Sequence, residues 1–145
     1  MRGMLLNLTA VYGLRALAVL ATLAPGASLN AADLADRTHV PQQYLSKVMR
    51  KLVLAKLVRS QRGHGGGFQL HRAPADITVA DALEALDLEV GAGCAFGFEA
   101  CDPANPCPLH PLWSQLQQSL QQWTGGSTFA GLLEPPRRPR SGGRS

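Results

Sequence analysis

The sequence predicts a mainly α-helical protein that combines a winged helix-turn-helix with a long C-terminal helix. Two short helical segments are joined by a tight turn at residues 38–40, which is typical of a helix-turn-helix. Two short extended runs flank a glycine-rich turn at residues 63–67, which is typical of a β-hairpin wing. Leu and Trp side chains at helical spacing over residues 111–123 predict the long helix.

The chain begins with a predicted core helix. Its apolar residues at helical spacing are Leu6, Ala10, Leu14, Leu17 and Ala21. Asn7 or Thr9 can cap its start, and Pro25-Gly26 is expected to end it. Arg15 interrupts the apolar stretch, and no span reaches the ~18 uncharged apolar residues that suggest a transmembrane helix. We therefore expect no signal peptide and no contact with a membrane. The protein is expected to be cytoplasmic.

The predicted helix-turn-helix has an apolar face and a polar face. Ser28-Leu29-Asn30 caps a short helix over residues 31–37, and Pro41 opens a second helix that runs to Lys56. The side chains expected to face the core are Leu45, Val48, Met49 and Leu52. Those expected on the polar face are Gln42, Gln43, Ser46, Lys47 and Arg50.

Charge is strongly segregated along the chain, whose formal net charge is +4. Residues 37–72 contain eight Lys or Arg and no Asp or Glu, whereas residues 73–136 contain eight Asp or Glu and no Lys or Arg. A generic solvent-facing helix usually mixes both signs. The basic half therefore predicts binding to double-stranded DNA, with the five polar-face residues as candidate contacts to bases or phosphates.

Residues 57–71 form the predicted wing. Glycine in its turn permits positive φ and lets two backbone segments approach closely. A phosphate-cradling loop of the nucleotide-binding type is a poor alternative, because the sequence has no Gly-Lys-Ser/Thr there. We expect Arg59, Arg62 and His64 to lie on the DNA backbone or in a minor groove.

The C-terminal half predicts a second unit. Thr78 is expected to cap a helix over residues 79–88, with Asp81 at the capping-box position. In the long helix, an uncharged glutamine face flanks the apolar stripe of Leu112, Trp113, Leu116, Leu120 and Trp123. This pattern favours dimerisation through the helix, and packing only on its own domain stays the alternative. Thr124-Gly125-Gly126-Ser127 is expected to break the long helix, and a last short turn is expected over residues 128–133.

These elements divide the chain into three predicted parts. Residues 1–75 form a winged helix-turn-helix DNA-binding domain. Residues 76–134 carry a cysteine loop and the dimerisation helix. Residues 135–145 form a basic tail rich in Pro, Gly and Ser, which is expected to be disordered.

All three cysteines lie in one loop that ends at a histidine. Their spacing is C-x6-C-x5-C-x2-H, and the four residues are Cys94, Cys101, Cys107 and His110. Thiolates and imidazole are the ligands of zinc and of iron–sulfur clusters, so the loop predicts a metal site of one of these kinds. Three free thiols are the alternative. A disulfide is less favoured, because the count is odd and the rest of the chain is of intracellular type.

Three stretches resemble the IscR/NsrR-type (Rrf-type) family of bacterial iron–sulfur winged-helix transcriptional regulators, and the resemblance covers residues 4–133. The stretches are Tyr12-Gly13-Leu14-Arg15-Ala16-Leu17, Tyr44-Leu45-Ser46-Lys47-Val48-Met49-Arg50-Lys51-Leu52 and Arg62-Gly63-His64-Gly65-Gly66-Gly67-Phe68-Gln69-Leu70. The resemblance implies a homodimer that acts as a repressor at a palindromic operator. It also implies a 2Fe–2S cluster, with 4Fe–4S as the alternative, that senses iron–sulfur status, nitric oxide or redox state.

Two features depart from the family pattern. The family spacing is more often C-x5-C-x5-C, and the first gap here is one residue longer. The nitric-oxide-sensing branch takes a fourth ligand from an acidic residue early in the partner's first helix, where this sequence has Val11 and no acidic residue before Asp33. Cys107-Pro108-Leu109-His110 instead resembles the Cys-x2-His of the cluster-biogenesis branch, which implies a Cys3His ligand set.

Three other classes of protein are alternatives to an iron–sulfur regulator. A winged-helix regulator with a structural zinc site is the main alternative. An enzyme is not expected, because the sequence offers no Cys–His–Asp arrangement for a reactive cysteine. A protein-interaction module would not need the basic recognition helix.

Overall fold

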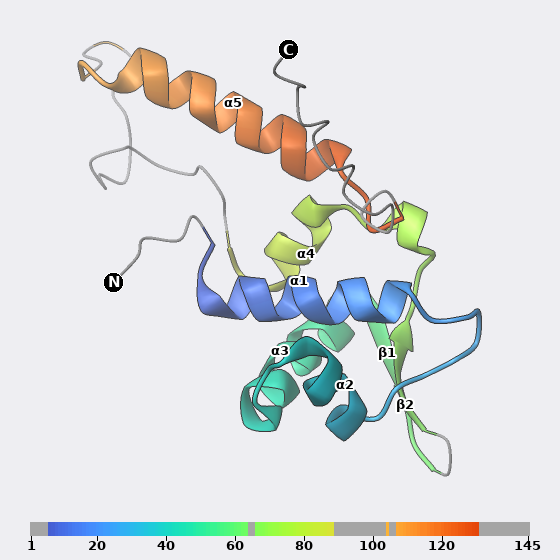
Figure 1. Cartoon of the computed structure of the whole chain (residues 1–145). Helices are drawn as coiled ribbons and strands as arrows, with labels where there is room; N and C mark the ends of the chain where they lie inside the picture. The colour runs from blue at the N-terminus through green and yellow to red at the C-terminus, as the bar shows by residue number, and fades with distance from the viewer. Residues whose placement is uncertain (1–5, 64–65, 89–103, 105–106, 131–145) are drawn as a thin grey trace, which may run out of the picture.

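The computed structural model describes residues 6–63, 66–88, 104 and 107–130. This part of the chain contains five α-helices, one short 3-10 helix and a two-stranded sheet (Figure 1). The mainly α-helical winged helix-turn-helix predicted from the sequence is therefore confirmed.

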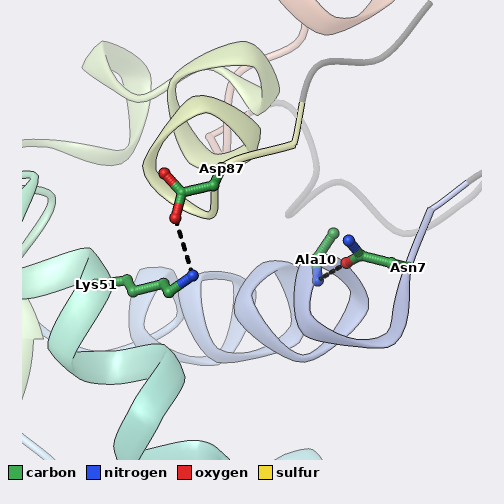
Figure 2. Close-up of polar contacts among 4 residues, drawn as sticks. All are labelled: Asn7, Ala10, Lys51 and Asp87. Atoms are coloured by element: carbon green, nitrogen blue, oxygen red, sulfur yellow. Dashed lines mark hydrogen bonds and ion pairs between the residues drawn. The ribbon is translucent and has the colours of Figure 1, made fainter.

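Helix α1 (Leu8–Ala21) lies at the centre of the molecule, with α2 and α3 on one side and α4 on the other (Figure 1). Asn7 caps its start, because the Asn7 side-chain oxygen accepts a hydrogen bond from the Ala10 N–H at 2.8 Å (Figure 2). The helix ends at Ala21, four residues before the predicted stop at Pro25-Gly26. Its last carbonyls accept from nearby amides, including Val19 O from the Thr22 N–H at 3.1 Å.

Helices α2 (Ala31–Thr38) and α3 (Gln42–Leu54) form the helix-turn-helix. Asn30 caps α2 by accepting a hydrogen bond from the Asp33 N–H at 2.8 Å. His39 then takes a left-handed conformation with φ of 56°, which ends α2 and turns the chain toward α3. Pro41 is the N-cap of α3 rather than its first helical residue, and the helix ends two residues before the predicted Lys56.

Strands β1 (Val58–Gln61) and β2 (Gly67–Leu70) form the wing. They are antiparallel, and the register runs from Val58 opposite Leu70 to Gln61 opposite Gly67. Leu29 joins the edge of this hairpin: its N–H donates to Phe68 O at 3.0 Å, and its carbonyl accepts from the Phe68 N–H at 2.7 Å. The wing is thereby fastened to the segment that leads into α2.

A short 3-10 helix, η1 (Pro74–Asp76), leads into α4 (Val79–Ala85). The predicted capping box is present: the Thr78 side chain accepts from the Asp81 N–H, and the Asp81 carboxylate accepts from the Thr78 N–H, both at 3.0 Å. The helix ends three residues before the predicted Leu88, and Asp87 has a positive φ of 59°.

Helix α5 (His110–Gly126) is longer than predicted at both ends. It continues through Thr124-Gly125-Gly126, where the sequence predicts a break. The Thr124 side chain is buried and its hydroxyl donates to Leu120 O at 2.9 Å. In the first part of the predicted turn over residues 128–133, Thr128 instead forms an isolated bridge with Thr78, and residues 131–133 lie outside the described part.

The main core lies under α1, α2 and α3 and reaches the wing. Its largest fully buried side chains are Phe129, Leu17, Leu34, Leu45, Met49, Leu52, Leu57 and Ile77. Phe129 follows α5, and its N–H donates to Ile77 O at 3.0 Å. The segment after the long helix therefore packs its Phe129 side chain into the core beside Ile77. This core fixes the positions of α3 and the wing relative to each other.

Candidate DNA interface and cysteine ligand set

The position of α3 follows from its apolar face. All four residues predicted to face the core are buried: Leu45, Val48, Met49 and Leu52. They recur every three or four residues, so the opposite side of the helix must face solvent. Gln42, Gln43, Ser46, Lys47 and Arg50 are indeed exposed. The sequence therefore predicted both faces of this helix correctly.

The exposed side chains of α3 are available to a partner. Gln42, Gln43, Lys47 and Arg50 make no side-chain hydrogen bond or ion pair with any residue that the structure describes. The Ser46 hydroxyl donates to Gln42 O at 3.0 Å, so its oxygen lone pairs remain free to accept a hydrogen bond. Gln42 and Gln43 are the first two residues of α3, and the N-terminal residues of a recognition helix are the ones that contact base edges.

The wing adds cations beside this helix. Arg59 in β1 and Arg62 just after it are exposed, and neither has a side-chain partner within the described ranges. His64 lies outside the described residues. Gly67 is required by packing, since a Cβ there would lie 2.3 Å from Leu29 O, a backbone atom that cannot easily move. This contact explains part of the glycine run on which the family resemblance depends.

An ion pair joins α3 to the end of α4 (Figure 2). Lys51 Nζ donates to Asp87 Oδ2 at 2.9 Å, across 36 positions of sequence. It is the one ion pair found among residues 6–63, 66–88, 104 and 107–130. Sequence reasoning missed it, because nothing in the spacing of a basic and an acidic residue so far apart indicates that they meet. Lys51 is thereby tied to the residue that stands two positions before the undescribed segment 89–103, which contains Cys94 and Cys101.

The structure describes two of the four predicted metal ligands. Cys107 is half-buried and its carbonyl accepts from the His110 N–H at 3.0 Å, which places the two residues within one turn at the start of α5. His110 Nε2 lies 3.3 Å from Ser114 Oγ. Cys94 and Cys101 lie outside the described residues, and no group of three or more potential ligands occurs within them. A set of three thiolates and one imidazole fits zinc or an iron–sulfur cluster by ligand chemistry.

The apolar stripe of α5 is largely uncovered by the rest of the chain. Leu112 is 67% exposed, Leu116 44% and Trp123 48%, whereas Trp113 and Leu120 are half-buried. The described side chains of α5 do not belong to the core, and Thr124 is the buried one among them. Apolar side chains arranged in a stripe and left in solvent are typical of a surface that a partner covers.

The described fold and site define a class of protein. A helix-turn-helix whose second helix exposes unpaired Gln, Lys and Arg beside a basic β-hairpin belongs to a winged-helix transcriptional regulator that binds DNA. Residues 6–135 match the Rrf2 family, described as iron-dependent transcriptional regulators. The chain belongs to this family, which confirms the resemblance stated above. Since the family consists of regulators, the chain is not an enzyme.

Curated relatives support the same assignment. The chain is 32% identical over 122 residues to the HTH-type transcriptional regulator ORF2 of Azotobacter vinelandii, covering 84% of this chain and 74% of the relative. It is 33% identical over 102 residues to the HTH-type transcriptional regulator IscR of Aliivibrio salmonicida, covering 70% of this chain and 61% of the relative. The match therefore spans about three fifths of that IscR.

Solved structures show the same fold. CymR, the global cysteine regulator of B. subtilis, superimposes with a TM-score of 0.76 at 24% identity, covering 88% of this chain and 94% of CymR. T. potens IscR superimposes with a TM-score of 0.72 at 25% identity, covering 90% of this chain and 87% of IscR.

Within the described part of the chain, no helix is both long and apolar enough to cross a membrane.

Proposed function

We propose that this chain is a homodimeric repressor whose affinity for a palindromic operator is controlled by an iron–sulfur cluster. The observation that carries the proposal is the exposed, unpaired polar face of α3 beside two unpaired wing arginines, in a stretch of sequence without any acidic residue. Membership of a family described as iron-dependent, together with a relative and a solved structure named IscR, supports the link to iron.

The proposed DNA contacts are of two kinds. Gln42, Gln43, Ser46 and Lys47 read base edges, and Arg50, Arg59, Arg62 and His64 bind phosphates or the minor groove. Glutamine can pair with adenine through two hydrogen bonds, which is worth about 1–3 kcal/mol of discrimination against the wrong base. Each phosphate contact instead contributes to every sequence alike and makes binding depend on salt.

This division can be tested by anisotropy titrations on duplexes selected from a random pool by the protein itself. Gln43→Ala is expected to lower the affinity for the selected site by about 5- to 100-fold and to leave the affinity for non-specific DNA unchanged. Arg50→Ala should weaken both, and should lower the slope of log affinity against log salt by about 1. Lys56→Gln, which removes a cation beyond the end of α3, is the control. Unchanged affinity in an Arg50→Ala, Arg62→Ala double variant would rule out this face.

The proposed ligands of the cluster are Cys94, Cys101, Cys107 and His110, all from one subunit. An iron–sulfur cluster supplies a redox-sensitive centre that nitric oxide, peroxide or iron shortage can attack. Cys107 and His110 sit at the start of α5, so binding through them would tie the cysteine loop to the proposed dimer helix. At the other end of that loop, Asp87 is tied to α3 through Lys51. Both ends of the loop thus adjoin elements that set how two recognition helices fit an operator.

Visible absorption spectra of protein purified without oxygen test the ligand set. Alanine at any of the three cysteines should abolish the chromophore. His110→Ala should leave a coloured protein whose cluster is lost faster, because a solvent molecule would replace imidazole, and His71→Ala is the matched control. Equal lability of His110→Ala and the wild type would move the fourth ligand elsewhere, with Glu99 and Asp102 as the next candidates. A colourless wild-type protein that contains zinc would favour the structural-zinc alternative.

A further inference from the structure

A pocket of about 430 Å³ lies between the end of α1, the linker that follows it and the root of the wing. Figure 1 shows the end of α1 beside the two strands. Leu20, Leu23 and Leu70 contribute apolar surface to its wall. Its polar and basic lining side chains are Arg59, Gln69, His71 and Arg72. No acidic residue lines it.

Gln69 is the buried polar group of this pocket. The residue is only 7% exposed, yet its side chain forms no hydrogen bond with any described residue. No described side-chain nitrogen or oxygen that is sealed from solvent lacks a partner. The Gln69 amide must therefore reach accessible space, and the space that it borders is this pocket. An amide held in a mostly buried position without a partner is ready to bind a polar group of a ligand.

Two arginines line this pocket together with Gln69. Arg59 is directly opposite Gln69 in the β1–β2 register, so the two side chains lie on the same face of the hairpin. Arg72 follows β2 by two residues and lines the same pocket. Neither guanidinium has an ion-pair or hydrogen-bond partner in the described part of the chain.

The end of α1 does little to offset these positive charges. Carbonyls at a helix C-terminus carry partial negative charge, but two of the last carbonyls of α1 already accept hydrogen bonds from the residues that follow the helix. Val19 O accepts from the Thr22 N–H at 3.1 Å and Leu20 O from the Leu23 N–H at 3.2 Å. In the linker beyond the helix, Ala24 O accepts from the Ala27 N–H at 2.9 Å. The pocket thus combines an apolar wall with two arginines that form no ion pair with a described residue, and Arg72 also lines a neighbouring pocket to which Asp81 and Glu84 contribute.

We propose that this pocket binds a small carboxylate with a short aliphatic body. A guanidinium offers paired N–H groups that match the two oxygens of a carboxylate, and the Gln69 amide can donate a further hydrogen bond. The leucine wall suits the aliphatic part. The volume lies in the range of about 300–1,000 Å³ that small-molecule pockets occupy. Such a ligand would bridge α1 and the root of the wing, and so give the regulator a second input apart from the cysteine loop.

The binding itself depends on neither DNA nor a cluster, so it can be measured on the full chain alone. The probe is isocaproate, titrated into ¹⁵N-labelled protein and followed by NMR. Isocaproamide, which keeps the aliphatic body but carries no charge, is the matched ligand. Saturable shifts are expected at Gln69 and Leu23 with isocaproate, and none with isocaproamide at the same concentrations.

Variants assign the binding to these side chains. Arg72→Gln and Gln69→Leu should each weaken isocaproate binding by about tenfold or more, since a hydrogen bond to a charged group is worth about 1.5–3 kcal/mol. Arg37→Gln removes the same charge from the exposed surface of α2 and should change affinity by less than about twofold, as expected for a screened surface charge. Gln69→Glu keeps the length of the side chain and should abolish isocaproate binding, because its carboxylate repels that of the ligand. If either Gln69 variant fails to fold, the other still tests the role of Gln69 in binding.

Three results would overturn the proposal. One is the absence of saturable shifts with isocaproate. A second is an equal loss of affinity in Arg37→Gln and Arg72→Gln. The third is movement of the Gln69 and Leu23 resonances by duplex DNA but not by isocaproate, which would make Arg72 a phosphate contact, as proposed above for Arg59, and leave the pocket without a carboxylate ligand.

Discussion

Gly13 marks the closest approach of α1 to the end of α4. It is buried in the middle of α1, and a Cβ built on it would lie 2.3 Å from Leu86 Cδ1 and 3.1 Å from Leu86 Cδ2. Leu86 is 2% exposed, so its methyl groups have little room to move away. Gly13→Ala should therefore overpack this contact at a cost of about 1–3 kcal/mol. Alanine also has a higher helix propensity than glycine, which offsets this cost by up to about 1 kcal/mol. We expect a net loss of about 1 kcal/mol, or about 2–4 °C in melting temperature for a chain of this size.

Urea denaturation followed by circular dichroism, on the full chain without oxygen, measures this loss. Gly125→Ala is the matched control, because Gly125 is also helical and a Cβ there would meet no atom within 4 Å. It should leave stability unchanged or raise it by up to about 1 kcal/mol. If Gly13→Ala proved as stable as the wild type, Leu86 would have moved aside freely and the tight packing inferred between α1 and α4 would be wrong.

Two further predictions concern the proposed signal path and the assembly. Lys51→Gln and Asp87→Asn remove a pair that is 42% and 78% exposed, so each should cost less than about 1 kcal/mol of stability, and together no more than either alone. Each should change the ratio of cluster-bound to cluster-free DNA affinity by less than about fivefold, and a larger change would show that the pair acts through other contacts. Leu116→Glu with Leu120→Glu should give monomers in sedimentation velocity, whereas Gln118→Glu should not. A stable dimer in the double variant would place the interface elsewhere.

The elements with strong local signals were predictable from the sequence. Asn7, Asn30 and Thr78 each cap a helix as their residue types indicate. The buried and exposed faces of α3 could be predicted from the helical period of its apolar residues alone. The ends of helices were less predictable, because tertiary packing there outweighs the helix propensity of the individual residues. Gly125-Gly126 indicates a break, yet α5 continues, since the buried Thr124 holds that turn in place.

Long-range contacts account for what the sequence could not show. Lys51 meets Asp87, Gly13 meets Leu86 and Gln69 faces a pocket built from α1 and the wing, and none of these has a local signature. Exposure of the candidate DNA contacts on α3 could be predicted, because it needs only the helical period. The meeting of the four candidate metal ligands stays a prediction, since Cys94 and Cys101 lie outside the described residues.

The central claim is that a cluster on the cysteine loop controls DNA binding. Its most direct test is a titration of a selected duplex with protein purified without oxygen, repeated as the cluster is removed stepwise by a chelator and its visible absorbance is recorded. We expect a coloured dimer whose DNA affinity changes in proportion to cluster occupancy, and a Cys107→Ala variant whose DNA affinity stays at the cluster-free value. A DNA affinity that stays constant while the colour disappears would contradict it.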